Sequence, residues 1–583
     1  MKKAFKSLGL YCIIGILVCF GILHYGQVRV ENAVLHRGNT SRPITLPLSQ
    51  KMDDGEKFSV RFAISNPLNL PYDLNIVPDD CAETMVVNGF VLSLKDYPER
   101  CNFKKGFWIA DSVTAPHRVG NETHYEISLT NGGGIAGINI FPKDNSFLLL
   151  FLKIMIAVLA GLFLVPVAKH LEFNSFVIFC VFSGVLLRFA MFYALPYTQF
   201  SMDIDGHLAY IQYIIDNRSI PAAKDCWSCY HPPVYYASAV PSFLLGEWFG
   251  YASTSGAQVL SLVLSLILLV TGLIILKQIV YGIPLGIASI LWTVWPVLLL
   301  VAPRIGNDQL FYALHTLCLL AGFNYIKNGK GMSLILAVVC AALAVWTKAT
   351  GYVSLGLVLL FTFVGFVKTN KLHRPSRTEI VGWALLLLVF AGLAVEKIVG
   401  SGDLVANIDT LHSRLRVGNE ARNFLYFDLR SFLIEPYTDG WADGQGREYF
   451  FNYALKTSLF GEWRLVDTAM GRALASLMSL SLLGLVVLSI RGWWNTKMDV
   501  CHWILFVQGT AFFAALAYLR YKYPYACSND FRYIMPALLS FLPYVGIGAY
   551  QEKYSLKWKV LGMIIVVTFS VSSVLLMSSI FAA

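Results

Sequence analysis

The sequence predicts a polytopic α-helical membrane protein that carries a small exported β-sandwich domain near its N-terminus. Of its 583 residues, 56% are hydrophobic and 14% are charged, whereas about 25% of residues are charged in soluble proteins. Apolar runs long enough to cross a bilayer recur along most of the chain. Residues 26–146 lack such runs and alternate polar with apolar side chains instead.

The first apolar run predicts a membrane anchor over residues 1–25. It follows Lys2, Lys3 and Lys6, as in a secretory signal peptide. No small-residue cleavage site stands before Tyr25, so an uncleaved anchor is favoured over a signal peptide. Either interpretation exports the segment that follows.

Residues 26–146 carry the strand pattern of a β-sandwich. Apolar residues alternate with polar ones in 58–64 and 124–129, and Asn88-Gly89 is typical of a tight turn. The pieces 79–81, 87–89, Cys101 and the glycine-rich stretch 132–137 resemble jelly-roll domains of the carbohydrate-binding type. The resemblance implies sugar binding, and a purely structural cap on the membrane domain is the alternative.

Four cysteines lie in the segments predicted to be exported. Cys81 and Cys101 are expected to form a disulfide, since an oxidising compartment favours one. For Cys226 and Cys229, a local disulfide is favoured over half of a zinc site, because no second CxxC pair accompanies them.

Residues 147–583 are predicted to form the membrane domain. With the anchor, the chain has thirteen candidate spans: 8–24, 147–168, 174–195, 257–276, 284–302, 309–327, 332–347, 351–367, 380–398, 471–490, 501–518, 533–549 and 559–580. A cytoplasmic N-terminus places the basic links inside, as the positive-inside rule requires. This count holds if 234–251, which contains Pro241 and Glu247, does not cross the membrane. It would then be an interfacial or re-entrant helix with both ends outside. The alternative is that 234–251 crosses.

On this topology the unusual polar residues share one face. Some lie in two large outer loops, 196–256 and 399–470, and the others lie in shorter outer turns around Arg304, Lys348 and Arg532. Ionisable groups are expensive near hydrocarbon, so their gathering indicates a reaction site. Cations that are kept outside against the positive-inside bias indicate an anionic ligand. Nucleic acid is an improbable partner, because neither a basic face nor an aromatic platform accompanies the net charge of +10.

A carboxylate at this face is suited to act as a general base toward an acceptor hydroxyl. Asp203 and Asp205 are the candidates, in the stretch Asp-Ile-Asp-Gly-His. Cations opposite them would hold a phosphate leaving group, whose negative charge grows as its bond breaks. Together these groups indicate glycosyl transfer from a lipid phosphate.

An ordered set of motifs between residues 174 and 550 resembles the GT-C superfamily of integral-membrane glycosyltransferases. The motifs are Asp203-x-Asp205-Gly-His207, His231-Pro-Pro, Arg304-x-x-Asn307-Asp308, Lys348-Ala-Thr-Gly351 and Arg532-Tyr-x-x-Pro536. Lipid A aminoarabinose transferases and protein O-mannosyltransferases belong to this superfamily. The resemblance implies a polyprenyl-phosphate sugar donor, catalysis on the outer face and inversion at the anomeric carbon.

The site residues are assigned to three roles. The catalytic base is Asp203 in preference to Asp205. Donor phosphate contacts are assigned to His231, Arg304, Lys348, Arg520 and Arg532. Substrate or sugar contacts are assigned to His207, Tyr235, Asn307, Asp308 and Glu462. No cofactor is certain, and a divalent metal ion held by Asp203, Asp205 and Asp308 is left open.

Several of these motifs have structural alternatives. Pro232-Pro233 is also a favourable helix start, Lys348 is placed to snorkel at a helix end, and Arg532 has Asp530 and Glu462 as ion-pair candidates. A transporter or flippase of lipid-linked sugars, and a lipid-linked glycan ligase or polymerase, are the functional alternatives. The expected location is a bacterial inner membrane with the site facing the periplasm, acting on an exported protein, lipid or polysaccharide.

Overall fold

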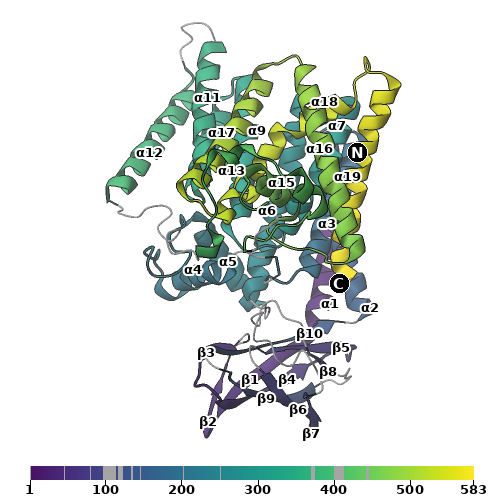
Figure 1. Ribbon diagram of the computed structural model, residues 1–583, viewed down its shortest axis with the longest axis vertical. Coiled ribbons are helices and arrows are strands. Elements are labelled where there is room, and N and C mark those ends of the chain that lie inside the picture. Colours follow the sequence, from purple (N-terminus) through teal and green to yellow (C-terminus); the bar gives the residue numbers. More distant parts are fainter. Residues whose placement is uncertain are drawn as a thin grey trace. The chain divides into compact units, whose positions relative to one another are not determined.

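The computed structural model of the chain divides it into two compact units, Met1–Pro166 and Val167–Ala583 (Figure 1). The structure describes residues 2–44, 46, 48–78, 81–95, 113–115, 122–132, 135–144, 146–197, 199–200, 203–249, 251, 253–368, 375–399, 413–441 and 446–582.

The first unit contains an antiparallel β-sandwich. Its ten strands are β1 (Arg29–Arg37), β2 (Thr40–Pro43), β3 (Leu48–Lys51), β4 (Lys57–Ser65), β5 (Tyr72–Pro78), β6 (Cys81–Val87), β7 (Phe90–Ser93), β8 (Val113–Ala115), β9 (Glu122–Thr130) and β10 (Ile135–Asp144). One sheet has the order β2-β1-β4-β9-β6-β7 and the other β3-β10-β5-β8. The small sheet domain predicted from the alternating pattern is therefore present.

The alternation in β4 decides which side chains form the core of the sandwich. Phe58, Val60, Phe62 and Ile64 are at most 5% exposed, because successive side chains of a strand point to opposite faces. Between β6 and β7, Asn88 and Gly89 both have positive φ, which is the geometry that a two-residue hairpin turn requires. Cys81 is disulfide-bonded, and Cys101, its predicted partner, lies outside the described residues.

Helices α1 (Lys2–Gly26) and α2 (Phe147–His170) flank the sandwich in sequence. Helices of the second unit are α3 (Ser175–Ala194), α4 (Ile204–Asn217), α5 (Val234–Trp248), α6 (Ser253–Ile279), α7 (Gly282–Val294), α8 (Pro296–Leu300), α9 (Asn307–Asn328), α10 (Gly331–Val345), η2 (Ala349–Gly351), α11 (Tyr352–Lys368), α12 (Arg377–Val399), η4 (Ser413–Leu415), α13 (Ala421–Leu425), α14 (Leu429–Ile434), α15 (Phe450–Phe460), α16 (Ala469–Trp494), α17 (Val500–Lys522), η5 (Ala526–Asn529), η6 (Phe531–Ser540), α18 (Leu542–Ala549) and α19 (Leu556–Ala582). The long helices α16 and α19 pack side by side (Figure 1).

Among the described residues, nine helices are long and apolar enough to cross a membrane, or ten if the bent pair of η6 and α18 is one span. All thirteen predicted spans fall on helices, but α7, α9 and α10 do not meet this criterion. Helices α7 and α10 are short, whereas α9 carries polar residues at both ends and is mostly buried. A helix surrounded by other helices needs no lipid-compatible surface. Helix α5 has 15 residues and is not among the candidate spans.

Chain direction brings several helix ends to one side of the second unit. Helix α9 begins at Asn307 and α10 ends at Val345, and the side chain of Asn307 hydrogen-bonds the carbonyl of Thr347 at 3.4 Å. Helix α6 joins them near its own start, where Ser261 donates to the carbonyl of Arg304. Arg304, Asn307, Asp308 and Lys348 of the predicted site lie at these helix ends.

Candidate active site

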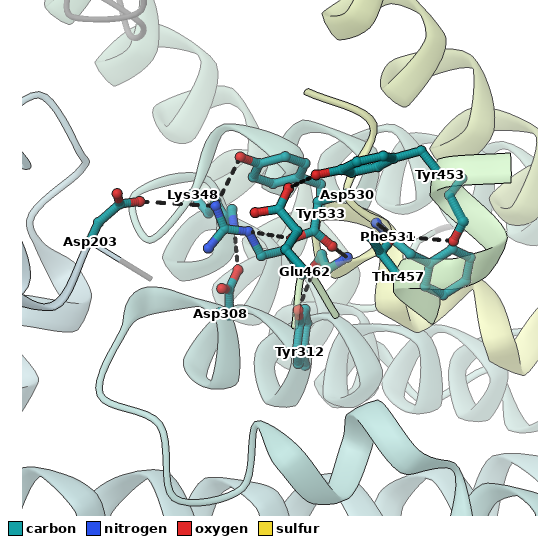
Figure 2. A network of polar contacts seen from close by, with 12 residues as sticks. Asp203, Asp308, Tyr312, Lys348, Tyr453, Thr457, Glu462, Asp530, Phe531 and Tyr533 are labelled. Carbon is teal, nitrogen blue, oxygen red and sulfur yellow. Dashed lines mark hydrogen bonds and ion pairs between the residues drawn. The ribbon is translucent and has the colours of Figure 1, made fainter. Parts of the chain in front are cut away.

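Asp203 occupies a strained backbone position directly before α4. Its φ and ψ of 52° and 29° are left-handed, a conformation that costs a non-glycine residue about 1–3 kcal/mol. The side chain does not cap the helix. It is 41% exposed, and its Oδ2 lies 3.9 Å from Nη2 of Arg532 (Figure 2). The carboxylate is therefore held at the edge of a cationic cluster, still open to a ligand.

A disulfide-closed loop packs against the first turn of α4. Cys226 and Cys229 are bonded to each other, which confirms the favoured prediction for this pair. Ser228 between them lies so close to Gly206 that a Cβ on Gly206 would overlap its hydroxyl. Glycine in the Asp-Gly-His stretch thus permits the close approach of the loop that carries His231.

We expect Gly206→Ala to displace this loop from α4 and to destabilise the protein by about 1–3 kcal/mol, as overpacking does. Thermal unfolding of the purified protein measures the effect. Gly356→Ala is the matched control, because a Cβ on Gly356 meets nothing within 4 Å. Adding Ser228→Gly to Gly206→Ala is expected to restore most of the loss. Equal unfolding temperatures for Gly206→Ala and Gly356→Ala would contradict the close approach.

Two histidines stack behind Asp203. The rings of His207 and His231 lie 5.9 Å apart, and Nδ1 of His207 hydrogen-bonds the hydroxyl of Tyr236 at 2.8 Å. Burial lowers the pKa of His207 to about 4, and burial with the neighbouring His207 and Lys348 lowers the pKa of His231 well below its usual value. Both rings are therefore neutral at pH 7, so any contact of His231 with a phosphate would be a hydrogen bond.

The turn before α9 is fixed by buried hydrogen bonds. The Gly306 backbone N–H donates to the hydroxyl of Tyr235 at 2.9 Å, and Asn307 is bonded to the end of α10. Tyr235 is fully buried and Asn307 is 3% exposed. Both residues, predicted as sugar contacts, here hold the backbone that presents Arg304 and Asp308.

Lys348 is buried and forms an ion pair with Asp308 (Figure 2). Its Nζ also lies 4.6 Å from the centroid of the Tyr533 ring. The snorkelling alternative therefore does not describe Lys348 in this structure, because only 7% of the residue is exposed. The pair ties the start of α9 to the segment that follows α10.

Removing one partner of a buried ion pair leaves an uncompensated charge, so we expect Asp308→Ala to lower the free energy of unfolding by about 3–5 kcal/mol. The double variant Asp308→Ala, Lys348→Met removes both charges and is expected to recover most of that loss. Chemical denaturation in mild detergent measures both. A double variant no more stable than Asp308→Ala would show that the pair does not carry the effect.

Contacts with residues of its own segment fix the side chain of Arg532. Its Nε lies 3.1 Å from Oδ2 of Asp530, and its Nη2 donates to the hydroxyl of Tyr533 at 3.2 Å. The hydroxyl of Tyr312, on α9, donates to the carbonyl of Arg532 (Figure 2). The pairing of Arg532 with Asp530 is one of the structural alternatives foreseen from the sequence. It also orients the guanidinium toward Asp203.

Glu462 enters the cluster from the outer loop 399–470. It lies two residues after the end of α15 and accepts a hydrogen bond from the hydroxyl of Tyr453 (Figure 2). Gly461 makes the turn with φ 63° and ψ −156°, which only glycine adopts readily. Trp463 packs over this turn and also lies 5.7 Å from the ring of Phe200.

Arg304 differs from the other two buried cations of the cluster. Its guanidinium has no ion pair with any described residue, and it lies 4.8 Å from the centroid of the Trp463 ring. The residue is 8% exposed, and burial lowers its pKa. It lines a small cavity of about 10 Å³ with His207, Gly306, Asp308 and Gln309. An aromatic face thus holds the cation while its N–H donors stay available to an anion.

The remaining predicted residues lie apart from these contacts. Asp205 is exposed in the first turn of α4 and joins none of the cluster's ion pairs among the described residues. The guanidinium of Arg520 donates to the carbonyl of Gly418 and to the Asn419 side chain. No group of three or more His, Cys, Asp or Glu side chains in the described part of the chain is placed to hold a metal ion.

Some residues of the cluster had no role in the sequence-based site. They are Tyr312, Tyr453 and Tyr533. Tyr533 belongs to the Arg532-Tyr-x-x-Pro536 motif and was therefore accessible to sequence reasoning. Tyr312 and Tyr453 sit inside helices, where aromatic residues are ordinary, and no sequence signal marked them.

Comparisons with known proteins add little at this level of similarity. No family model matches the chain, and no curated protein matches it. Among solved structures, the chain is similar to arabinosyltransferase EmbB from Mycobacterium smegmatis, with 12% identity and a TM-score of 0.32. That similarity covers 99% of this chain and 64% of that chain, which is less than two thirds of its length. The functional conclusions below therefore rest on the site.

Proposed function

We propose that the chain is an inverting glycosyltransferase that moves a sugar from a polyprenyl-phosphate donor to an acceptor hydroxyl on the outer face of the membrane. The observation that carries this proposal is the presence in one cluster of an accessible carboxylate, Asp203, and a buried cation, Arg304, that has no ion pair with any described residue. The first group is suited to accept a proton, and the second is suited to bind a phosphate.

The transfer requires one proton movement and one displacement. Asp203 accepts the proton of the acceptor hydroxyl as that oxygen bonds to the anomeric carbon of the sugar. The bond from that carbon to the phosphate oxygen breaks, and its electron pair stays on the polyprenyl phosphate. Arg304 stabilises this charge, helped by Lys348 and Arg532, whose own charges are already partly compensated. Attack opposite the leaving group inverts the anomeric centre.

Charge at the far helix ends supports an outward-facing site. Helices α9, η6 and α11 each start at the site, so the links that follow α9, α18 and α11 lie at the other end. Those links and their neighbours are basic: Lys327, Lys330, Arg377, Arg491, Lys497, Lys553 and Lys557. The positive-inside rule favours a cytoplasmic location for that end, which supports a site on the outer face. The membrane that we propose is a bacterial inner membrane, with the site facing the periplasm.

Asp203 and Asp308 lie beside Arg532 and Lys348 respectively, so the cluster supplies its own positive charge. A divalent ion at Asp203, Asp205 and Asp308 is the alternative source. Chelation with EDTA distinguishes the two, and we expect turnover to persist in EDTA. The acceptor is an exported protein, lipid or polysaccharide.

The decisive experiment supplies purified protein with a panel of short-chain polyprenyl-phosphate sugars and follows release of polyprenyl phosphate. We expect release from at least one donor and inversion in the product. A protein that releases none but moves labelled lipid-linked sugar across vesicles is instead a flippase. Release of a diphosphate from a donor with a long glycan identifies a ligase or polymerase.

A further inference from the structure

We propose that Glu462 enters the reaction as a neutral carboxylic acid and that its Oε2 hydroxyl donates a hydrogen bond to a hydroxyl group of the bound neutral sugar. This inference rests on the proposed function, because it names a contact of that same site. It assigns Glu462 a protonation state and a hydrogen-bonding direction, and it separates Glu462 from Asp203, which acts as an ionised base.

The two oxygens of Glu462 have different surroundings. Oε1 accepts a hydrogen bond from the hydroxyl of Tyr453. Tyr453 is fully buried, so packing fixes its position. Oε2 has no hydrogen bond to any described residue. The turn at Gly461 fixes the chain on one side of Glu462, and Trp463 packs over that turn on the other. A fixed carboxyl group with one uncommitted oxygen is suited to bind a ligand.

The charges around Glu462 disfavour a second carboxylate. The groups that face it are Tyr453 from α15, Cys527 from η5, Asp530 directly before η6, Arg532 within η6 and Asp203 directly before α4. Arg532 is the cation among them, and it is already engaged by Asp530 at 3.1 Å and lies 3.9 Å from Asp203. An ionised Glu462 would therefore be a third carboxylate around one guanidinium.

Burial first, and then repulsion from Asp530, raise the pKa of Glu462 to about 8. The group is consequently protonated at pH 7. A carboxylic acid both donates and accepts hydrogen bonds, whereas a carboxylate only accepts them. A sugar hydroxyl that donates its own proton to another partner can still accept a hydrogen bond. A protonated carboxyl group can donate that bond, whereas a carboxylate cannot. An amino sugar would instead favour the ionised form, so a neutral sugar is the matching ligand.

Two measurements test the proposal with full-length protein in nanodiscs. Infrared difference spectroscopy of wild type minus Glu462→Gln is expected to show the carbonyl band of a protonated carboxyl group at pH 7. That band should titrate away with a midpoint near pH 8. Glu435→Gln, an exposed glutamate of the same outer loop, is the matched control and should show no such band.

Release of polyprenyl phosphate from neutral polyprenyl-phosphate hexoses and pentoses is then followed against pH. Wild-type kcat/KM should fall about tenfold per pH unit above the pKa, and Glu462→Gln should lack that fall because an amide cannot ionise. At pH 7, Glu462→Ala should be about tenfold less active than Glu462→Gln, since only Gln keeps a donor for the sugar hydroxyl.

The pH dependence of stability gives a further check, and the raised pKa fixes the direction of that dependence. The folded state raises the pKa from 4.5 to about 8, so the stabilisation by the bound proton is complete below pH 4.5 and is lost as the pH rises through 8. The unfolding temperature of wild type should therefore fall relative to Glu462→Gln across that window. A flat difference would mean that the folded and unfolded states bind the proton equally.

Absence of the carboxyl band at pH 7, or equal activity of Glu462→Gln and Glu462→Ala, would overturn the proposal. If wild type neither binds nor consumes any donor, the proposed function fails and the sugar contact fails with it. The infrared band still decides the protonation state in that case, so the two failures are distinguishable.

Discussion

Asp203→Asn is expected to lower kcat by about 10³-fold while the donor still binds, because an amide cannot accept the proton of the acceptor hydroxyl. Asn is nearly isosteric with Asp and tolerates the left-handed backbone that this position adopts. The change therefore removes the base without disturbing the start of α4. Release of polyprenyl phosphate measures kcat, and equilibrium binding of the donor measures affinity.

Asp205→Asn should have a much smaller effect on kcat, because Asp205 is exposed and joins none of the described ion pairs of the cluster. Asp216→Asn, on the exposed last turns of the same helix, is the matched control for any general effect on α4. If Asp205→Asn loses activity and Asp203→Asn keeps it, the base has been assigned to the wrong carboxylate. Loss of donor binding in Asp203→Asn would assign Asp203 a binding role instead.

Hydrophobic patterns were enough to predict the long helices and the small sheet domain, but not the shorter helices α4, α13, α14 and α15. Long apolar runs predicted helices, and alternation in β4 predicted a buried strand face whose residues are at most 5% exposed. The number of spans was harder to predict from the sequence. Helix α9 carries polar residues because other helices, and not lipid, surround most of it. Its Asn307, Tyr312 and His315 are buried among other helices, so apolarity does not measure whether the helix lies inside the bundle.

The pairing of charges was the part of the site that residue types alone left undetermined. Lys348, Arg532 and Arg304 have the same charge and similar motif positions, yet only Arg304 has no carboxylate partner among the described residues. Which cation is compensated depends on distances that the fold sets between segments far apart in sequence. For the same reason, the contact of Tyr453 with Glu462 had no sequence signal.

Arg304→Met is expected to lower kcat/KM by about 10²–10³-fold, as removal of a charge that stabilises a developing anion does. The same change is expected to raise the unfolding temperature. Arg304 is 8% exposed and has no ion pair within the described part of the chain, so the protein without ligand bears the desolvation cost of its charge. Met keeps an apolar contact with the ring of Trp463. A gain in stability with a loss of activity is the expected behaviour of a cation held ready for a ligand.

Lys348→Met provides the contrast. It removes a compensated cation and leaves Asp308 buried without its partner, so both stability and activity should fall. Arg464→Gln, an exposed neighbour of Trp463, is the control for the loop and should change neither property. Added phosphate should raise the unfolding temperature of wild type more than that of Arg304→Met, because a ligand that binds only the folded state stabilises it. If Arg304→Met unfolds at a lower temperature and responds equally to phosphate, the guanidinium is structural and the anion binds elsewhere.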